Sequence, residues 1–133
     1  MKTFFAGLAV SVGLMAGSIG GAAAQDVGTV VATCKTPGAA EECQRLVNEF
    51  VAAAKRTAGT PRAFDDLLAT LAIALGSEIG GLPPAILTQL ADAIRNLSDD
   101  FVEVLRGNQA VAAADSVAGG NPVLTGEIEG SGA

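Results

Sequence analysis

Two cysteines and a set of carboxylates are the side chains of this chain best suited to chemistry, and none of its 133 residues is histidine. Without histidine, the chain lacks the commonest general base and the commonest transition-metal ligand of proteins. Nucleophilic systems that pair serine or cysteine with histidine are therefore excluded. Carboxylate chemistry is the enzymatic option that the composition leaves.

Adjacent acids are the candidates for that chemistry, and they occur as Glu41 with Glu42, Asp65 with Asp66, and Asp99 with Asp100. Neighbouring side chains on a helix point about 100° apart, so such a pair does not face one substrate. Two of these pairs also fall near predicted helix starts, where acids complement the helix dipole. We therefore expect solvated or capping charges, no catalytic residue and a non-enzymatic protein.

No metal or cofactor site is expected either. No stretch has the alternating oxygen ligands and central glycine of a twelve-residue calcium loop. The glycines of residues 76–81 are not followed by the Gly-Lys-Ser/Thr ending of a phosphate-binding loop. Asn96, Leu97 and Ser98 match a glycosylation sequon, but they lie inside a predicted helix, and we expect Asn96 to be unmodified.

Cys34 and Cys43 lie on either side of a Thr36-Pro37-Gly38 turn. An even pair of nearby cysteines in an exported protein is most simply one structural disulfide. A redox or zinc site normally has a C-x-x-C spacing or further ligands, and the sequence has neither. We predict a bond between Cys34 and Cys43.

Residues 1–24 have the order of a secretory signal peptide. Lys2 precedes an apolar run over residues 4–19, and Ala22, Ala23 and Ala24 supply the small residues of a cleavage site. The alternative is an uncleaved anchor, but a helix of about 16 residues spans only ~24 Å of a ~30 Å hydrocarbon core. We expect cleavage before Gln25, no stable membrane anchor, and a periplasmic or secreted protein.

The composition of the remaining chain indicates an acidic helical domain. Half of all residues are hydrophobic, but the only aromatic residues are 5 phenylalanines, which is typical of packed helices. Loss of Lys2 changes the net charge from −6 to −7, so nucleic acid and anionic membranes are poor partners. Residues 25–133 are enough for one domain.

Periodicity and capping residues predict the helices. Residues 25–33 are expected to be an extended lead-in, and Thr36 to cap a helix that ends before Gly59. A second helix is expected from Thr60 to about Gly76, followed by a loop over residues 76–82. Apolar residues recur at helical spacing in both helices, from Cys43 to Ala54 and from Phe64 to Leu75.

A heptad-like pattern follows Pro83 and Pro84, and its apolar residues are Leu87, Leu90, Ile94, Leu97, Phe101 and Val104. The pattern favours one long helix over residues 84–106, ended by Gly107 and Asn108. The alternative is a new helix starting at residues 98–100, because Asp100 and Glu103 have the capping-box spacing. These apolar residues form the candidate interaction face.

The last part of the chain is expected to be a weak helix over residues 108–118 and a flexible, Gly-rich, acidic tail over residues 119–133. Pairing of residues 122–128 with residues 27–33 as strands is the less favoured alternative. The predicted fold is all-α, a bundle of three helices, or of four if residues 108–118 pack as another helix. The helical domain covers residues 25–118.

The function predicted from these features is an exported interaction or structural protein. It would form homo-oligomers or bind another exported protein through the candidate interaction face and the apolar second helix. A carrier of a small apolar ligand between the helices is the alternative. No resemblance to a known family is found in the residues after the signal-like segment.

The signal-like segment generates the first prediction. N-terminal sequencing or intact mass of the exported protein should show a chain that begins at Gln25, because the small residues Ala22 and Ala24 precede that bond. Exported material that retains Met1 would contradict it.

Overall fold

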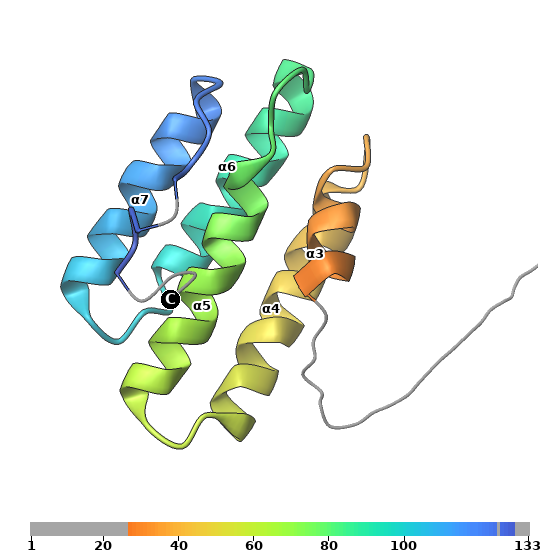
Figure 1. Ribbon diagram of the computed structural model, residues 1–133. Helices are drawn as coiled ribbons and strands as arrows, with labels where there is room; N and C mark the ends of the chain where they lie inside the picture. The colour runs from red at the N-terminus through yellow and green to blue at the C-terminus, as the bar shows by residue number, and fades with distance from the viewer. Residues whose placement is uncertain (1–26, 125, 130–133) are drawn as a thin grey trace, which may run out of the picture.

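The computed structural model describes residues 27–124 and 126–129, and this part of the chain contains helices and no strand (Figure 1). The helices are α3 (Val27–Cys34), α4 (Ala40–Thr57), α5 (Pro61–Ser77), α6 (Pro84–Ser98) and α7 (Val104–Ala118). The predicted all-α class is therefore confirmed. The predicted signal peptide over residues 1–24 lies outside the described residues.

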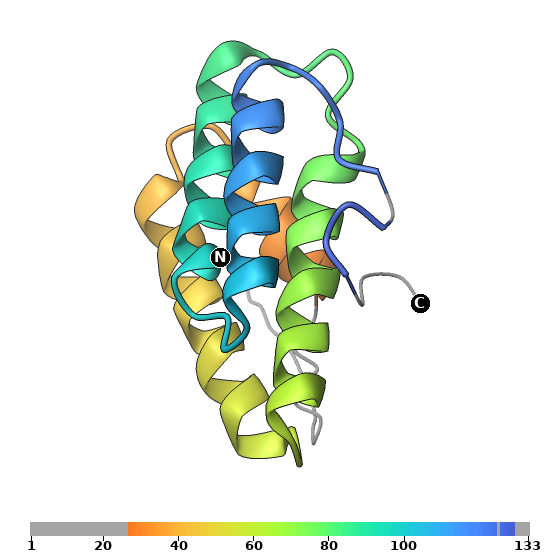
Figure 2. The same ribbon diagram turned by 90° about the vertical axis from the view of Figure 1, so that its left-hand side faces the viewer.

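Helices α4 to α7 form a bundle in which consecutive helices run in opposite directions (Figures 1 and 2). Helix α6 packs against α4, α5 and α7, and the short α3 packs against α4, α5 and α6. Helix α7 lies at one edge of the bundle, against α6 and α5. Because consecutive helices are joined by short connections, each is the neighbour of the next.

The apolar pattern of α4 and α5 is confirmed except at Leu67, which is 37% exposed, and the caps are confirmed in part. Thr60 caps α5, since its hydroxyl accepts a hydrogen bond from the backbone N–H of Ala63 at 3.0 Å. The predicted start of α4 at Thr36 was wrong, because the helix begins at Ala40. The Thr36 hydroxyl instead donates to the Ala32 carbonyl at 2.9 Å, so Thr36 belongs to the turn that follows α3.

The expected extended lead-in was also wrong, because Val27–Cys34 is helix α3. Val30 and Cys34 lie one helical turn apart and are buried against the bundle. The β-branched residues of this segment favour a strand only weakly, and burial of a helical face outweighs that preference. The segment therefore adds a fifth helix to the predicted three or four.

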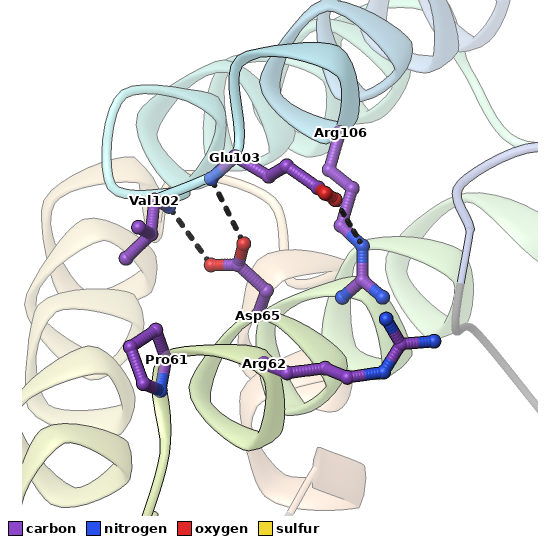
Figure 3. Close-up of a pocket in the computed structure, with 6 residues that line it drawn as sticks. All are labelled: Pro61, Arg62, Asp65, Val102, Glu103 and Arg106. Atoms are coloured by element: carbon purple, nitrogen blue, oxygen red, sulfur yellow. Dashed lines mark hydrogen bonds and ion pairs between the residues drawn. The ribbon is translucent and has the colours of Figure 1, made fainter.

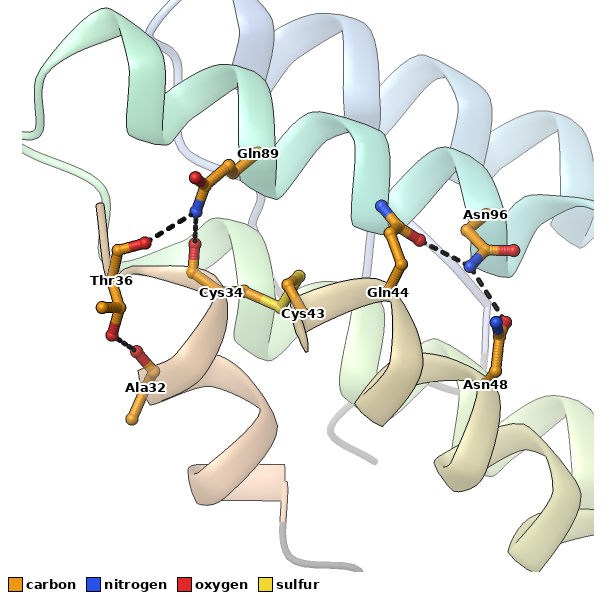
Figure 4. Close-up of a disulfide and its surroundings, with 8 residues drawn as sticks. All are labelled: Ala32, Cys34, Thr36, Cys43, Gln44, Asn48, Gln89 and Asn96. Carbon is orange, nitrogen blue, oxygen red and sulfur yellow. Dashed lines mark hydrogen bonds between the residues drawn. A yellow bond between two sulfur atoms is a disulfide. The ribbon is translucent and has the colours of Figure 1, made fainter. Parts of the chain in front are cut away.

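Cys34 and Cys43 form the predicted disulfide, with an S–S distance of 2.03 Å and both residues fully buried (Figure 4). The loop that they close turns at Gly38, whose φ of 77° suits glycine. Gln89 of α6 donates hydrogen bonds to the carbonyls of Cys34 and Thr36, both at 3.0 Å. The disulfide and Gln89 together join α3, α4 and α6.

Asn96 of the sequon has its side chain engaged between α6 and α4. Its amide donates to Gln44 Oε1 at 2.6 Å and to Asn48 Oδ1 at 3.1 Å (Figure 4). An amide held in this way inside a helix is poorly placed to receive a glycan. The expectation that Asn96 is unmodified stays a prediction.

The predicted long helix over residues 84–106 was wrong, because α6 ends at Ser98 and α7 begins at Val104. The alternative start at residues 98–100 was closer, but it lies several residues too early. Gly107 and Asn108 do not end a helix; both lie inside α7. A Cβ on Gly107 would lie 3.1 Å from the Ser98 carbonyl oxygen, so this glycine lets α7 approach α6 closely.

The C-terminal segment buries apolar side chains, which contradicts the expectation of a tail without a core contribution. Val123 is 2% exposed and Ile128 is fully buried. The N–H of Val123 donates to the Gly76 carbonyl at 2.8 Å, and the N–H of Glu129 donates to Gln109 Oε1 at 3.0 Å. Residues 119–124 and 126–129 therefore pack onto the bundle, without the strand pairing that was the alternative.

A substitution at Gly76 tests this packing most directly. A Cβ there would lie 2.7 Å from Val123 Cγ2 and 2.8 Å from Val117 Cγ2. Gly76→Ala should therefore lower the free energy of unfolding by about 1–3 kcal/mol, although alanine normally stabilises a helix interior relative to glycine. Urea unfolding of the purified protein measures this.

The matched control is Gly80→Ala, where a Cβ meets no atom within 4 Å and the change should be within about 0.5 kcal/mol. In a Val123→Ala background the cost of Gly76→Ala should fall, because one of the two close contacts is then removed. A stabilising effect of Gly76→Ala would show that Val123 does not pack there.

Candidate interaction surface

The predicted interaction face is divided between the core and the surface. Leu90, Ile94 and Leu97 are fully buried, and Leu87 and Phe101 are partly buried against the core. Val104 is 75% exposed. These residues do not form one continuous face, because residues 99–103 separate α6 from α7.

Exposed apolar residues instead gather on α7. Val104, Leu105 and Val111 have exposed fractions of 75%, 52% and 42%. Asn108, Ala112 and Asp115 are exposed on the same side of the helix, three or four residues from one another or from these positions. We define the outer face of α7 by these residues: Val104, Leu105, Asn108, Val111, Ala112 and Asp115.

The opposite side of α7 packs on the bundle and is made mainly of small residues. Its buried members are Arg106, Ala110, Ala113, Ala114 and Val117. A helix at the surface of a globular protein normally has an apolar inner side and a polar outer side. In α7 the larger aliphatic side chains Val104, Leu105 and Val111 are directed outward, and only Val117 is directed inward.

The start of α7 is positioned by Asp65 of α5, which is 3% exposed. Its Oδ1 accepts a hydrogen bond from the Val102 N–H at 2.8 Å, and its Oδ2 accepts one from the Glu103 N–H at 3.0 Å (Figure 3). Both carboxylate oxygens are thus used by backbone groups that directly precede α7. Asp65 therefore stabilises the connection between α6 and α7.

Arg106 provides a second polar contact between α7 and α5. Its side chain is 2% exposed, and its Nη1 lies 2.8 Å from Asp66 Oδ1. Its Nε forms an ion pair with Glu103 Oε1 at 3.1 Å (Figure 3), although the angles are not those of a hydrogen bond. Since a buried cation needs its anions, these contacts fix the rotation of α7 about its axis.

Hollows beside this connection are shallow and partly charged. One of about 230 Å³ is lined by Pro61, Arg62, Asp65, Val102, Glu103 and Arg106 (Figure 3). A second, of about 320 Å³, has a more apolar lining: Lys55, Ala58, Gly59, Thr60, Pro61, Phe64 and Val102. Asp65 and Arg106 are already engaged within the protein, so the first hollow offers no free carboxylate from Asp65.

A third hollow, of about 460 Å³, lies between α4 and α6 and has a polar lining: Ala40, Glu41, Gln44, Arg45, Asn48 and Asp92. Arg45 there binds Glu42 and Glu49 of its own helix. The hydrogen bond from Arg45 lowers the pKa of Glu42. These charges are exposed and paired along α4, as expected for a solvated helix surface.

Of the adjacent acids, Asp65 and Asp66 diverge as predicted for neighbours on a helix. Asp65 binds the backbone before α7, whereas Asp66 binds Arg106. Burial raises the pKa of Asp100 above its usual value, Lys55 partly offsets this, and Asp99 adds to it. Asp100 lies in the connection between α6 and α7, and its N–H donates to the Leu97 carbonyl.

Within residues 27–124 and 126–129, no group of three cysteine or acidic side chains is placed to hold a metal ion. None of the helices in that part of the chain has the length and apolarity needed to cross a membrane. No protein-family model matches the chain, and no curated protein or solved structure shows significant similarity to it. The geometry of the surface therefore carries the functional argument.

Sequence reasoning found Val104 and missed Leu105 and Val111. The interpretation of Gly107 as a helix stop separated Val104 from Val111, which lie seven residues apart on one side of α7. A helical pattern continued through Gly107 would have aligned them. The weak apolar pattern of residues 108–118 reflects a helix that is apolar on both sides.

The position of α7 should depend on Asp65. Asp65→Asn places an amide NH₂ toward one of the two backbone donors, so we expect a loss of about 1–3 kcal/mol in the free energy of unfolding. Thermal or urea unfolding measures this loss. Asp92→Asn is the control, because the Asp92 side chain is 55% exposed and its ion pair with Arg95 contributes little. Equal stability of the two variants would contradict the assigned role.

Proposed function

We propose that this protein is exported and acts as a non-enzymatic interaction module, which binds a protein partner through the outer face of α7. The observation that carries the proposal is the exposure of Val104, Leu105 and Val111 on one side of one helix. Scattered exposed apolar residues are ordinary, whereas a continuous group of them is typical of interaction surfaces.

The outer face of α7 belongs to a well-held helix. Asp65 and Arg106 hold the N-terminal end of α7, and its alanine-rich inner side packs on α5 and α6. A surface that is already in its binding geometry loses little conformational freedom on association. Burial of these side chains would contribute about 25 cal/mol per Å² of apolar area removed from water.

Export is supported by the buried disulfide between Cys34 and Cys43. Structural disulfides persist in oxidising compartments, such as the periplasm or the outside of the cell. The net charge of −7 after signal removal supports a protein partner over nucleic acid or an anionic membrane surface. The partner is then another exported protein or a further copy of this chain.

A carrier of a small apolar ligand is the second candidate, and the hollow beside Phe64 and Val102 is the observation that favours it. Its volume of about 320 Å³ is at the lower end for ligand pockets of about 300–1,000 Å³. Native mass spectrometry of protein purified from its host tests this candidate, since a carrier would retain a ligand mass. We favour the interaction module because Val104, Leu105 and Val111 lie outside this hollow, so a ligand bound there would not cover them.

The proposal predicts contacts at the outer face of α7 in the native compartment. A photo-reactive amino acid in place of Asn108 should give defined protein adducts when the exported protein is irradiated in its own host. The same group in place of Ala52, an exposed residue of α4, should give none. Absence of adducts at position 108, or equal yields at both positions, would contradict the proposed function.

A further inference from the structure

The segment that joins α4 to α5 concentrates the basic side chains that have no partner. Among the residues that the structure describes, the basic side chains with neither an ion pair nor a hydrogen bond are Lys55, Arg56 and Arg62. The other basic side chains of that part are bound to carboxylates or to a backbone carbonyl: Lys35, Arg45, Arg95 and Arg106. Residues 55–62 contain no acid, so an acidic protein has one segment with three unpaired positive charges.

Helix dipoles explain only part of this arrangement. Lys55 and Arg56 lie in the last turn of α4, where a cation is favoured. Arg62 is the second residue of α5 and lies at the positive end of that helix, where a cation is disfavoured. Since no acid of the described chain compensates Arg62, the segment presents a positive field to an anion from outside.

The hollow of about 320 Å³ lies beside this segment, and its lining contains one charged residue, Lys55, and no acid. Its apolar lining includes Phe64, which is buried, and Val102, which is 62% exposed. Thr60 also lines it, and the Thr60 hydroxyl oxygen accepts a hydrogen bond from the backbone, which leaves the hydroxyl proton available to donate. A cation and a hydroxyl donor therefore border an apolar surface.

The carboxylates at this end of the bundle are mostly engaged with other groups. Asp65 accepts hydrogen bonds from the backbone before α7, and Asp66 and Glu103 both pair with Arg106 (Figure 3). Asp100 is the exception, because its charge interacts with Lys55 although no ion pair joins the two described side chains. The Lys55 ammonium is thus open to a further anion.

We propose that this hollow binds a small amphipathic anion, whose oxyanion group lies at Lys55 and whose apolar part lies on Phe64 and Val102. An uncharged apolar molecule would leave the ammonium unpaired, and a small hydrophilic anion would leave the apolar lining in water. The site goes beyond the interaction module, because it is separate from the outer face of α7. It gives the carrier candidate a definite class of ligand, a carboxylate or a phosphate monoester with a short apolar tail.

The size of the hollow indicates a short ligand. Its volume is at the lower end for ligand pockets, so octanoate, with one carboxylate and a short aliphatic tail, is the first probe. A molecule of about ten non-hydrogen atoms in a shallow site is expected to have a dissociation constant on the order of 1 mM. Added salt should weaken the binding, because the charge that attracts the anion is exposed.

Nuclear magnetic resonance titration of the isotope-labelled mature protein tests the site. Octanoate should shift the amide signals of Lys55, Gly59 and Val102 and approach saturation at about 10 mM, while the signal of Val111 on the outer face of α7 should not move. Octanol has the same tail without the charge and should bind about fivefold more weakly. Acetate has the charge without the tail and should not saturate. Octyl phosphate compares the two oxyanion groups.

Substitutions of neighbouring cations separate the site from general attraction. Lys55→Met keeps the aliphatic stem without the charge and should weaken octanoate binding about fivefold. Arg56→Met is the matched control, since it makes the same change of charge at an exposed residue outside the lining, and its effect should be less than about twofold. Asp100→Asn removes the acid that acts on Lys55 and should strengthen binding about twofold. Unchanged melting temperatures of Lys55→Met and Arg56→Met exclude unfolding as the cause.

Several results would overturn the inference. Shifts that stay linear in octanoate, or equal effects of Lys55→Met and Arg56→Met, would mean non-specific attraction. Equal affinities for octanol and octanoate would contradict an anionic ligand. A photo-reactive amino acid in place of Gly59, where a Cβ meets no atom within 4 Å, tests the other occupant: defined protein adducts in the host would show that a partner protein covers the hollow. The adducts at position 108 test the interaction module separately.

Discussion

The buried carboxylate of Asp65 is the interaction on which the second half of this structure depends. Its oxygens accept hydrogen bonds from the N–H groups of Val102 and Glu103, which lie 37 and 38 residues later in the chain. A buried carboxylate without such donors would be costly, so the connection between α6 and α7 has one favourable path. That path ends α6, begins α7 at Val104, and sets α7 against α5 and α6.

Arg106 explains why α7 presents its larger apolar side chains to solvent. Rotation of α7 to bury Val104, Leu105 and Val111 would gain apolar burial, but it would remove Arg106 from Asp66 and turn the buried alanines outward. The loss of one partner from a buried ion pair is costly, at about 3–5 kcal/mol. This cost is comparable to the free energy gained by burying about two aliphatic side chains. The polar contacts thus select a rotation that hydrophobic burial alone would not.

Local features of the sequence were enough to predict the parts of the fold that depend on nearby residues. Thr60 and Pro61 mark the start of α5, Pro84 begins α6, and the cysteine spacing indicates the disulfide. The errors lie in the elements whose structure depends on residues that are distant in the sequence. The break after Ser98 is held by hydrogen bonds to Asp65, and Gly107 lies inside α7 where a Cβ would come within 3.1 Å of the Ser98 carbonyl oxygen. The candidate surface was found only at Val104, because the misread glycine concealed the rest of α7.

The described part of the C-terminal segment packs on the bundle and leaves the outer face of α7 exposed. The chain has apolar side chains after α7 that could cover exposed surface, and it uses Val123 and Ile128 in the core. Val123 packs at Gly76, and Glu129 is held by Gln109, so this segment covers the bundle beside α5 rather than the outer face. The same fold therefore closes one apolar surface with its own chain and leaves Val104, Leu105 and Val111 in solvent. Within the described part of the chain, their exposure follows from how α7 is held, and the proposed association would remove their apolar area from water.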